Sequence, residues 1–238
     1  MKTLPPVLAV LGAGVMACST TETRYIDEPL PETTDAGTAT DSGMSPDSGL
    51  GILSFRPPAS FSGFDGTHSF KVPVAVYSAA DDLVVSASNG AGVVPKRLVE
   101  PARGGVTDNG RYFLVTVKQA GPITLTATTG GRTATSTITV TSYPAGRWAR
   151  GETRYTKGES GDPPCTDCHV NGQGVDHSPA SLSTATDEKV GITITTGISP
   201  YNVPILIDGQ PSHSWKVSDA ERDGLVTYLR GLEPRGFE

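Results

Sequence analysis

The sequence has few cysteines and few aromatic residues, and it has no methionine in its second half. Its 238 residues include 3 cysteines and 3 methionines, and aromatic residues make up 6%. Met1, Met16 and Met44 all lie near the N-terminus. A C-terminal metal site therefore cannot use methionine as a ligand. So few cysteines also exclude a scaffold held together by several disulfides.

The chain also lacks a basic patch in its folded part. The formal net charge is -6, and residues 18–50 hold one basic and seven acidic residues. The acidity is therefore concentrated in one segment, and residues 51–238 are close to neutral. This distribution gives no electrostatic footprint for nucleic acid, so we expect no nucleic-acid partner.

The N-terminus has the features of an export signal. An apolar run, Leu4 to Val15, follows Lys2 and is too short to span a membrane. It ends in Val15-Met16-Ala17-Cys18, which resembles the lipobox of bacterial lipoproteins. The resemblance implies that residues 1–17 are removed and that Cys18 carries lipid. Ser19 then suggests the outer membrane, facing the periplasm or the cell surface. An ordinary secretory signal with a chance cysteine is the alternative.

Residues 18–50 are rich in Thr, Ser, Asp, Glu, Pro and Gly and poor in large apolar side chains. Such a segment cannot bury enough surface to offset the entropy of ordering it. We therefore expect an acidic, disordered tether between the lipid and the folded part of the chain.

Residues 51–142 read as one small β-sandwich. Short β-branched runs are separated by Gly, Pro, Asn and Asp, and five of them predict strands: 70–77, 83–87, 112–117, 123–128 and 133–140. Thr129-Gly130-Gly131-Arg132 predicts a hairpin turn between the last two. Pro73 predicts an edge or interrupted strand. The segment resembles bacterial Ig-like domains, notably in 134–140, and we expect it to act as a spacer.

Cys165-Thr166-Asp167-Cys168-His169 is the most specific motif. Cys-x-x-Cys-His in an exported chain indicates covalent attachment of a c-type haem. The two thiols become thioethers to the two vinyl groups of the porphyrin, and His169 becomes an axial ligand of the iron. With Cys18 taking the lipid, every cysteine has a role and no disulfide is expected.

Two other uses of the cysteine pair compete with haem. A redox-active dithiol usually lies within a βαβ unit. Here Gly161-Asp162-Pro163-Pro164 precedes the motif and a Gly-rich loop, 170–175, follows it, so the surrounding sequence does not favour a dithiol. A structural zinc site is harder to exclude, because His177 and His213 would complete a Cys2His2 set with Cys165 and Cys168.

The end of the chain predicts an amphipathic helix. Ser218 and Glu221 form a capping box, and an apolar face follows, comprising Leu225, Tyr228, Leu229 and Leu232. This helix, the haem motif and Gly197-Ile198-Ser199-Pro200 resemble a class I cytochrome c domain. The resemblance covers residues 143–238 and implies a small all-α fold around the haem.

The sequence departs from that family at three places. Pro163 and Pro164 disfavour a helix leading directly into the motif. Residues 189–196 alternate as a strand does, where the family would place a helix. The family's second axial ligand is commonly methionine, which this region lacks.

The second axial position therefore has several candidates. His213 is favoured because it lies just before the C-terminal helix, where the family's methionine would fall. His177 is the alternative, although it follows His169 too closely to reach the opposite face of the porphyrin easily. Lys216 or an open position remain. Two histidine ligands predict a potential below that of a His/Met relative.

These observations predict a multidomain fold class, an all-β Ig-like sandwich followed by a small all-α cytochrome c-like haem domain. The predicted function is electron transfer without enzymatic turnover, by a lipid-anchored protein with one haem c whose partners are redox proteins. Open-site haem chemistry, as a peroxidase-type enzyme or gas sensor, is one alternative. A zinc-stabilised surface-binding module is the other.

Overall fold

The structure is a computed structural model and describes residues 52–78, 80–100, 110–159, 161–169, 174–207, 210–211 and 215–238. The predicted signal peptide (1–17), the lipidated Cys18, the tether (18–50) and His213 lie outside the described residues. Those predictions are therefore not tested by the structure.

Eight strands form two four-stranded sheets. The first sheet has the order β1 (Ser54–Arg56), β3 (Lys71–Tyr77), β6 (Arg111–Thr116), β5 (Gly92–Lys96). The second has the order β2 (Ala59–Phe64), β8 (Arg132–Ser142), β7 (Ile123–Thr129), β4 (Val84–Ala87). Strands β2 and β8 run parallel, and the other pairs in these sheets are antiparallel.

The strands form where apolar side chains alternate with polar ones. In β7, Ile123, Leu125 and Ala127 are fully buried while the residues between them face outward or are half-buried. The predicted hairpin turn is present, because Gly130 and Gly131 both have positive φ between the paired residues Thr129 and Arg132. The inward faces of the two sheets thus share one apolar core.

Pro73 lies in a strand that is interior in the sheet order. Strand β3 pairs with both β1 and β6, but β1 covers only residues 75–77 of it. Pro73 therefore has a ladder partner on the β6 side, Leu114, and lies beyond the short neighbour on the other side. The strand is interrupted on one side, which is how it accommodates a proline.

Five helices follow the sandwich among the described residues: α1 (Arg147–Lys157), α2 (Thr166–His169), α3 (Pro179–Leu182), α4 (Asp187–Thr196) and α5 (Asp219–Arg230). The short strands β9 (Leu206–Ile207) and β10 (Gln210–Pro211) pair between α4 and α5. Helices α1 and α5 pack closely where Gly151 meets Gly224, since a Cβ on Gly151 would lie 2.0 Å from the Gly224 carbonyl oxygen. Within the described part of the chain, no helix has the length and apolar character needed to cross a membrane.

Local capping signals explain two of the helices. The predicted capping box of α5 is confirmed: Ser218 and Glu221 each hydrogen-bond the other's backbone N–H. Residues 189–196, whose alternation is strand-like, instead belong to α4. Thr186 caps that helix, with its hydroxyl accepting from the Lys189 N–H, and Gly197 ends it in the left-handed conformation. The caps override the alternation.

The predicted fold class is wrong. The described chain is mostly β, with two sheets and a few short helices, and it contains no small all-α haem domain. Helices α2 and α3 have only four residues each, and the helical segment (residues 144–238) also contains the β9–β10 pair. The physical reason is that the helices of this segment share only a small apolar cluster, and the segment also packs against the sandwich.

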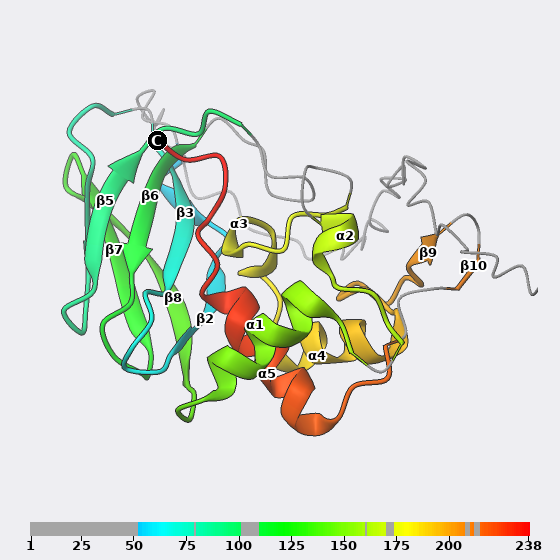
Figure 1. Cartoon of the computed structure of the whole chain (residues 1–238). Helices are drawn as coiled ribbons and strands as arrows, with labels where there is room; N and C mark the ends of the chain where they lie inside the picture. The colour runs from blue at the N-terminus through cyan, green and yellow to red at the C-terminus, as the bar shows by residue number, and fades with distance from the viewer. Residues whose placement is uncertain are drawn as a thin grey trace, which may run out of the picture.

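Several contacts join the helical segment to the sandwich. The Tyr143 hydroxyl, at the end of β8, donates to Asp187 Oδ2 of α4 at 2.8 Å. The Phe61 N–H of β2 donates to the Ser183 carbonyl at 2.7 Å. Figure 1 shows the C-terminal segment running from α5 back over the sandwich, where the backbones of Arg97 and Glu238 exchange two hydrogen bonds.

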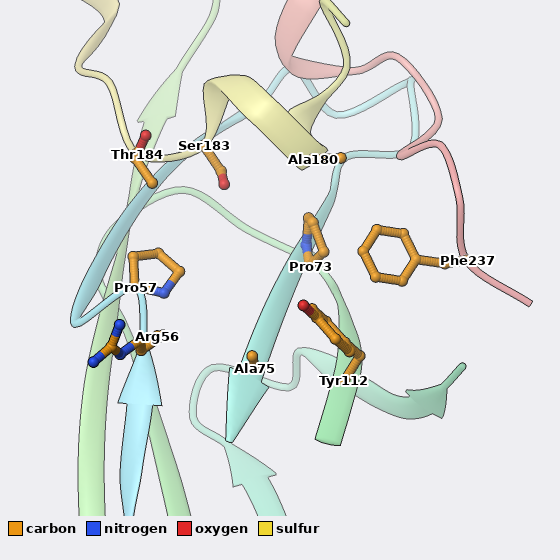
Figure 2. Close-up of a pocket in the computed structure, with 9 residues that line it drawn as sticks. All are labelled: Arg56, Pro57, Pro73, Ala75, Tyr112, Ala180, Ser183, Thr184 and Phe237. Atoms are coloured by element: carbon orange, nitrogen blue, oxygen red, sulfur yellow. The ribbon is translucent and has the colours of Figure 1, made fainter. Parts of the chain in front are cut away.

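A small pocket marks the same junction. It has a volume of about 30 Å³ and is lined by residues of the sheet, of α3 and of the C-terminal segment. In Figure 2, Pro73 and Tyr112 of the sheet, Ala180 of α3 and Phe237 surround it. This volume is about that of one water molecule. The pocket is therefore a packing gap between the two parts.

Candidate haem-binding site

The cysteine motif lies at α2: Cys165 directly precedes this helix, and the other four residues of the motif form it. The Cys168 and His169 N–H groups both donate to the Cys165 carbonyl, at 3.3 and 3.1 Å, which closes a helical turn. Residues three apart in such a turn lie on one side of it. Cys165 and Cys168 are both half-buried, as is His169. The local fold therefore brings together the three residues that the sequence assigned to haem attachment.

A buried arginine positions the loop that leads into the motif. Arg154 of α1 is 3% exposed and donates to Asp162 Oδ2 at 2.6 Å and to the Glu159 carbonyl at 3.3 Å. Gly158, with φ 66°, turns the chain back so tightly that a Cβ there would lie 2.4 Å from the Asp162 carbonyl oxygen. Together these contacts fix the loop that ends at Cys165. Pro163 and Pro164 lie in this loop and not in a helix.

The imidazole of His169 is held in one orientation. Its Nδ1 lies 2.8 Å from the Val175 carbonyl oxygen. A carbonyl oxygen only accepts, so Nδ1 carries the proton and the neutral ring keeps its lone pair on Nε2. Gly174 passes over the ring, since a Cβ there would lie 2.6 Å from His169 Nδ1. The result is the tautomer that a metal-ligating histidine needs.

His177 lies beside His169 and not opposite to it. The two rings stack, with centroids 3.5 Å apart and an interplanar angle of 23°. Imidazole lone pairs lie in the ring plane, so stacked rings do not aim at one iron from opposite sides. His177 also lies against Tyr155, with ring centroids 5.8 Å apart. In this arrangement His177 is a neighbour of His169, the predicted proximal ligand.

Cys165 lies against the second apolar cluster of the molecule. It packs, together with Trp215, on buried residues of α1, α4 and α5 that include Tyr155, Ile194 and Leu225. Burial raises the pKa of the Cys165 thiol to about 11, although the Arg154 guanidinium acts in the opposite direction. The thiol is therefore neutral at physiological pH, and its surroundings are apolar, as a porphyrin edge requires.

The two cysteines differ in their bonding. Cys165 is a free thiol, whereas Cys168 is disulfide-bonded in the structure, and its partner is not among the described residues. The sequence predicted no disulfide. A thioether at Cys168 needs that sulfur to be reduced, so the state of Cys168 is the first thing that an experiment on this site must establish.

The residues present fit a covalently attached haem. They supply two cysteines three positions apart, an adjacent histidine whose Nδ1 faces a carbonyl oxygen, and an apolar cluster beside Cys165. For the zinc alternative, the described residues contain no group of three or more His, Cys, Asp or Glu side chains placed to hold a metal ion. Its fourth predicted ligand, His213, lies outside them.

Several contributors to this site were not predicted from the sequence. The Val175 carbonyl and the close approach of Gly174 are backbone features, and only the Gly-rich character of 170–175 pointed to that loop. The role of Arg154 could not be predicted from the sequence, because its partner Asp162 lies eight residues away in a loop and not one helical turn away. His68 was assigned no role, yet its ring stacks on Trp148, with centroids 4.0 Å apart.

No known protein-family model matches the chain, and no curated protein sequence matches it. The resemblances found in the sequence therefore remain resemblances.

Proposed function

We propose that this protein carries single electrons through one haem attached covalently to Cys165 and Cys168, with His169 as the axial ligand. The observation that carries the proposal is His169 itself. It follows the two cysteines directly, and its Nδ1 donates to the Val175 carbonyl at 2.8 Å, so the neutral ring carries its lone pair on Nε2, as an iron ligand must. When bound, the haem would supply an iron that stores one electron by alternating between its ferric and ferrous states.

The protein's contribution is to orient the residues that would hold the haem and to exclude water from them. By accepting a hydrogen bond from Nδ1, the Val175 carbonyl makes the Nε2 lone pair of His169 a stronger ligand for iron. The Gly174 backbone keeps the ring from rotating. The Arg154–Asp162 pair holds the loop before Cys165. The apolar cluster around Tyr155 and Leu225 gives the attached edge a surface with low polarity. Fixed ligands and a dry surface both limit the reorganisation that accompanies electron transfer.

The second axial ligand in this proposal is His213, with His177 as the alternative. The stacking of His177 on His169 favours His213. Trp215, two positions after His213 in the sequence, packs on the same cluster as Cys165. An imidazole in place of methionine lowers the reduction potential, because Met/His ligation is the pairing that raises it.

The proposal extends to where the carrier works. Acylation at Cys18 would anchor it to the outer membrane, on the periplasmic side or at the cell surface, and residues 18–50 would tether the folded part. The sandwich would act as a spacer. The partners would be redox proteins that accept or donate one electron at a time.

The test is to produce the full-length protein in a host that matures c-type haem, and to compare it with Cys165→Ser, Cys168→Ser and His169→Ala. Peptide masses locate the haem, and visible spectra of the oxidised and reduced protein, with and without carbon monoxide, report the ligands. We expect haem on both cysteines, a low-spin spectrum that carbon monoxide does not change, and loss of that spectrum in all three variants.

Cys18→Ser removes the predicted lipid and keeps the haem motif, and because Cys18 is the third cysteine of the sequence it also removes the remaining cysteine with which Cys168 could pair within the chain. It should release the protein from membranes without changing its spectrum. Protein without haem, or with Cys168 still in a disulfide, contradicts the proposal. A change in the spectrum on adding carbon monoxide would support the haem but contradict the electron carrier. It would favour the open-site enzyme or sensor.

A further inference from the structure

The C-terminal segment, the last six residues of the chain, crosses from α5 to the sandwich (Figure 1) and is fastened there at both of its ends. At its far end the backbones of Glu238 and Arg97 exchange two hydrogen bonds, of 2.8 and 2.9 Å. At its near end the Lys71 ammonium of β3 lies 2.7 Å from one carboxylate oxygen of Glu233 and 2.8 Å from the other. Arg235 lies between these two attachments, so the sandwich fixes the backbone from which its side chain extends.

Arg235 contacts the chain just after the haem motif in two ways. Its backbone N–H donates to the Ser178 hydroxyl oxygen at 3.3 Å. Its guanidinium Nε lies 3.5 Å from Asp176 Oδ1, and among the described residues it is the cation that pairs with this carboxylate. The Ser178 hydroxyl donates to the other carboxylate oxygen, Oδ2. Asp176 is 5% exposed, and a buried carboxylate is costly to leave without its cation.

Asp176 in turn fixes the carbonyl group that orients His169. The Val175 carbonyl and the Asp176 N–H belong to one planar peptide group, so holding Asp176 limits the rotation of that carbonyl. The next peptide group is held too, because the Ser181 hydroxyl donates to the Asp176 carbonyl. The Val175 side chain is exposed and gives little anchorage of its own. The position of the Val175 carbonyl, 2.8 Å from His169 Nδ1, therefore depends on how Asp176 is held.

We propose that Arg235 is a positioning residue for His169. It holds Asp176 and, through the shared peptide group, the Val175 carbonyl. The sandwich thus has a role besides that of a spacer, because it carries the segment that delivers Arg235. This inference rests on the proposed function and deepens it. Loss of Arg235 should leave His169 in the motif and loosen the hydrogen bond that selects its Nδ1–H tautomer.

The experiment compares the full-length protein with its Arg235→Gln variant, which removes the charge and keeps a polar side chain. The first readout is the exchange of the His169 Nδ1–H with solvent, followed by NMR of histidine-labelled, reduced protein. A proton in a well-formed hydrogen bond exchanges slowly, and we expect exchange to be several-fold faster in Arg235→Gln. The second readout is the reduction potential. It should rise, because a weaker hydrogen bond at Nδ1 makes Nε2 a less basic ligand.

Two further variants separate positioning from a general loosening of the C-terminal segment. Arg235→Lys keeps a cation beside Asp176 and should restore both readouts in part, since it lacks the planar guanidinium. Arg97→Gln is the matched control. Arg97 also pairs with an acid at this junction, Glu238, but both side chains of that pair are largely exposed. Its loss should change neither readout.

An unchanged exchange rate in Arg235→Gln would overturn the positioning role. Equal changes in Arg97→Gln would overturn it too, because they would show that any weakening of the C-terminal segment has this effect. Faster exchange at an unchanged potential would mean that Arg235 holds the loop without influencing the ligand, and it would also contradict the proposal.

Failure of the proposed function is distinguished from failure of this inference. A chain that takes up no covalent haem contradicts the electron carrier. The exchange of the His169 Nδ1–H needs no iron, so the same comparison of variants on the haem-free chain still decides whether Arg235 orients the ring. A chain that carries haem and shows no effect of Arg235→Gln contradicts only the role of Arg235.

Discussion

The sandwich and the helical segment are stabilised in different ways. The sandwich core has 14 buried apolar residues, whereas the cluster in the helical segment has 7. The buried charged residues of the described chain, Arg154, Asp176 and Arg230, all belong to the helical segment. Burial of apolar surface is non-directional and sufficient for the sandwich. The helical segment depends on hydrogen bonds between particular pairs, and these depend on charge.

Arg230 shows this dependence most clearly. Its side chain is 2% exposed and donates to Asp187 Oδ1 at 2.9 Å, to the Leu182 carbonyl at 2.7 Å and to the Ala185 carbonyl. Tyr143 donates to the other oxygen of the same carboxylate. One guanidinium therefore joins α5, the turn after α3, the start of α4 and, through Asp187, the sandwich.

The largest expected effect comes from removing that charge. Arg230→Met leaves the Asp187 carboxylate without its cation and two carbonyls without donors, and we expect a loss of about 3–5 kcal/mol in the free energy of unfolding. Denaturant titration measures it. Arg222→Met on the same helix is the control, because Arg222 pairs with the 90% exposed Asp219 and should lose at most about 1 kcal/mol. Equal losses in the two variants would contradict the comparison.

A core truncation in the sandwich should cost somewhat less and act differently. Ile138→Ala removes a fully buried side chain, and we expect a loss of about 2–4 kcal/mol, with haem uptake unchanged in whatever fraction remains folded. Thr137→Ala, the adjacent outward-facing position, should change stability by less than about 0.5 kcal/mol. Loss of haem attachment in folded Ile138→Ala protein would show that the two parts are not separable in this way.

The smallest effect depends on pH. Hydrogen bonds from the Ser218 hydroxyl and N–H hold the pKa of Glu221 below its usual range. A lowered carboxyl pKa contributes stability that is present above the pKa of the unfolded chain and is lost as pH falls through the folded pKa. Glu221→Gln should therefore cost about 0.5–1 kcal/mol at neutral pH and nearly nothing in acid. An equal cost at both pH values would mean that the carboxylate charge is irrelevant.

The sequence predicted the local features of both regions. Alternation located β7 and β8, two glycines located the turn between them, and the Ser218–Glu221 pair located the start of α5. Cys-x-x-Cys-His indicated three residues that do lie together on one turn. Each of these signals is contained within a few neighbouring residues.

The fold class could not be predicted in the same way, because it depends on contacts between distant residues. The helical segment joins the sandwich through Tyr143, Asp187 and Arg230, and no local pattern relates these three positions. The resemblance to a cytochrome domain described helices without showing what they pack against. The orientation of His169 was equally hidden, since its partner is the backbone carbonyl of Val175.

The parallel pairing of β2 with β8 has a consequence for folding speed. Strand β8 can form with β7 through a tight turn, but β2 must find it across the intervening chain, so that Ala59 meets Thr137 and Phe64 meets Ser142. Contacts between residues so far apart form late, because the loop must close before they contribute. Gly63 of β2 contacts the Tyr143 ring, so the anchor of the helical segment is also completed by this late step. We therefore expect β2 to be the rate-limiting strand and the helical segment to dock only after it closes.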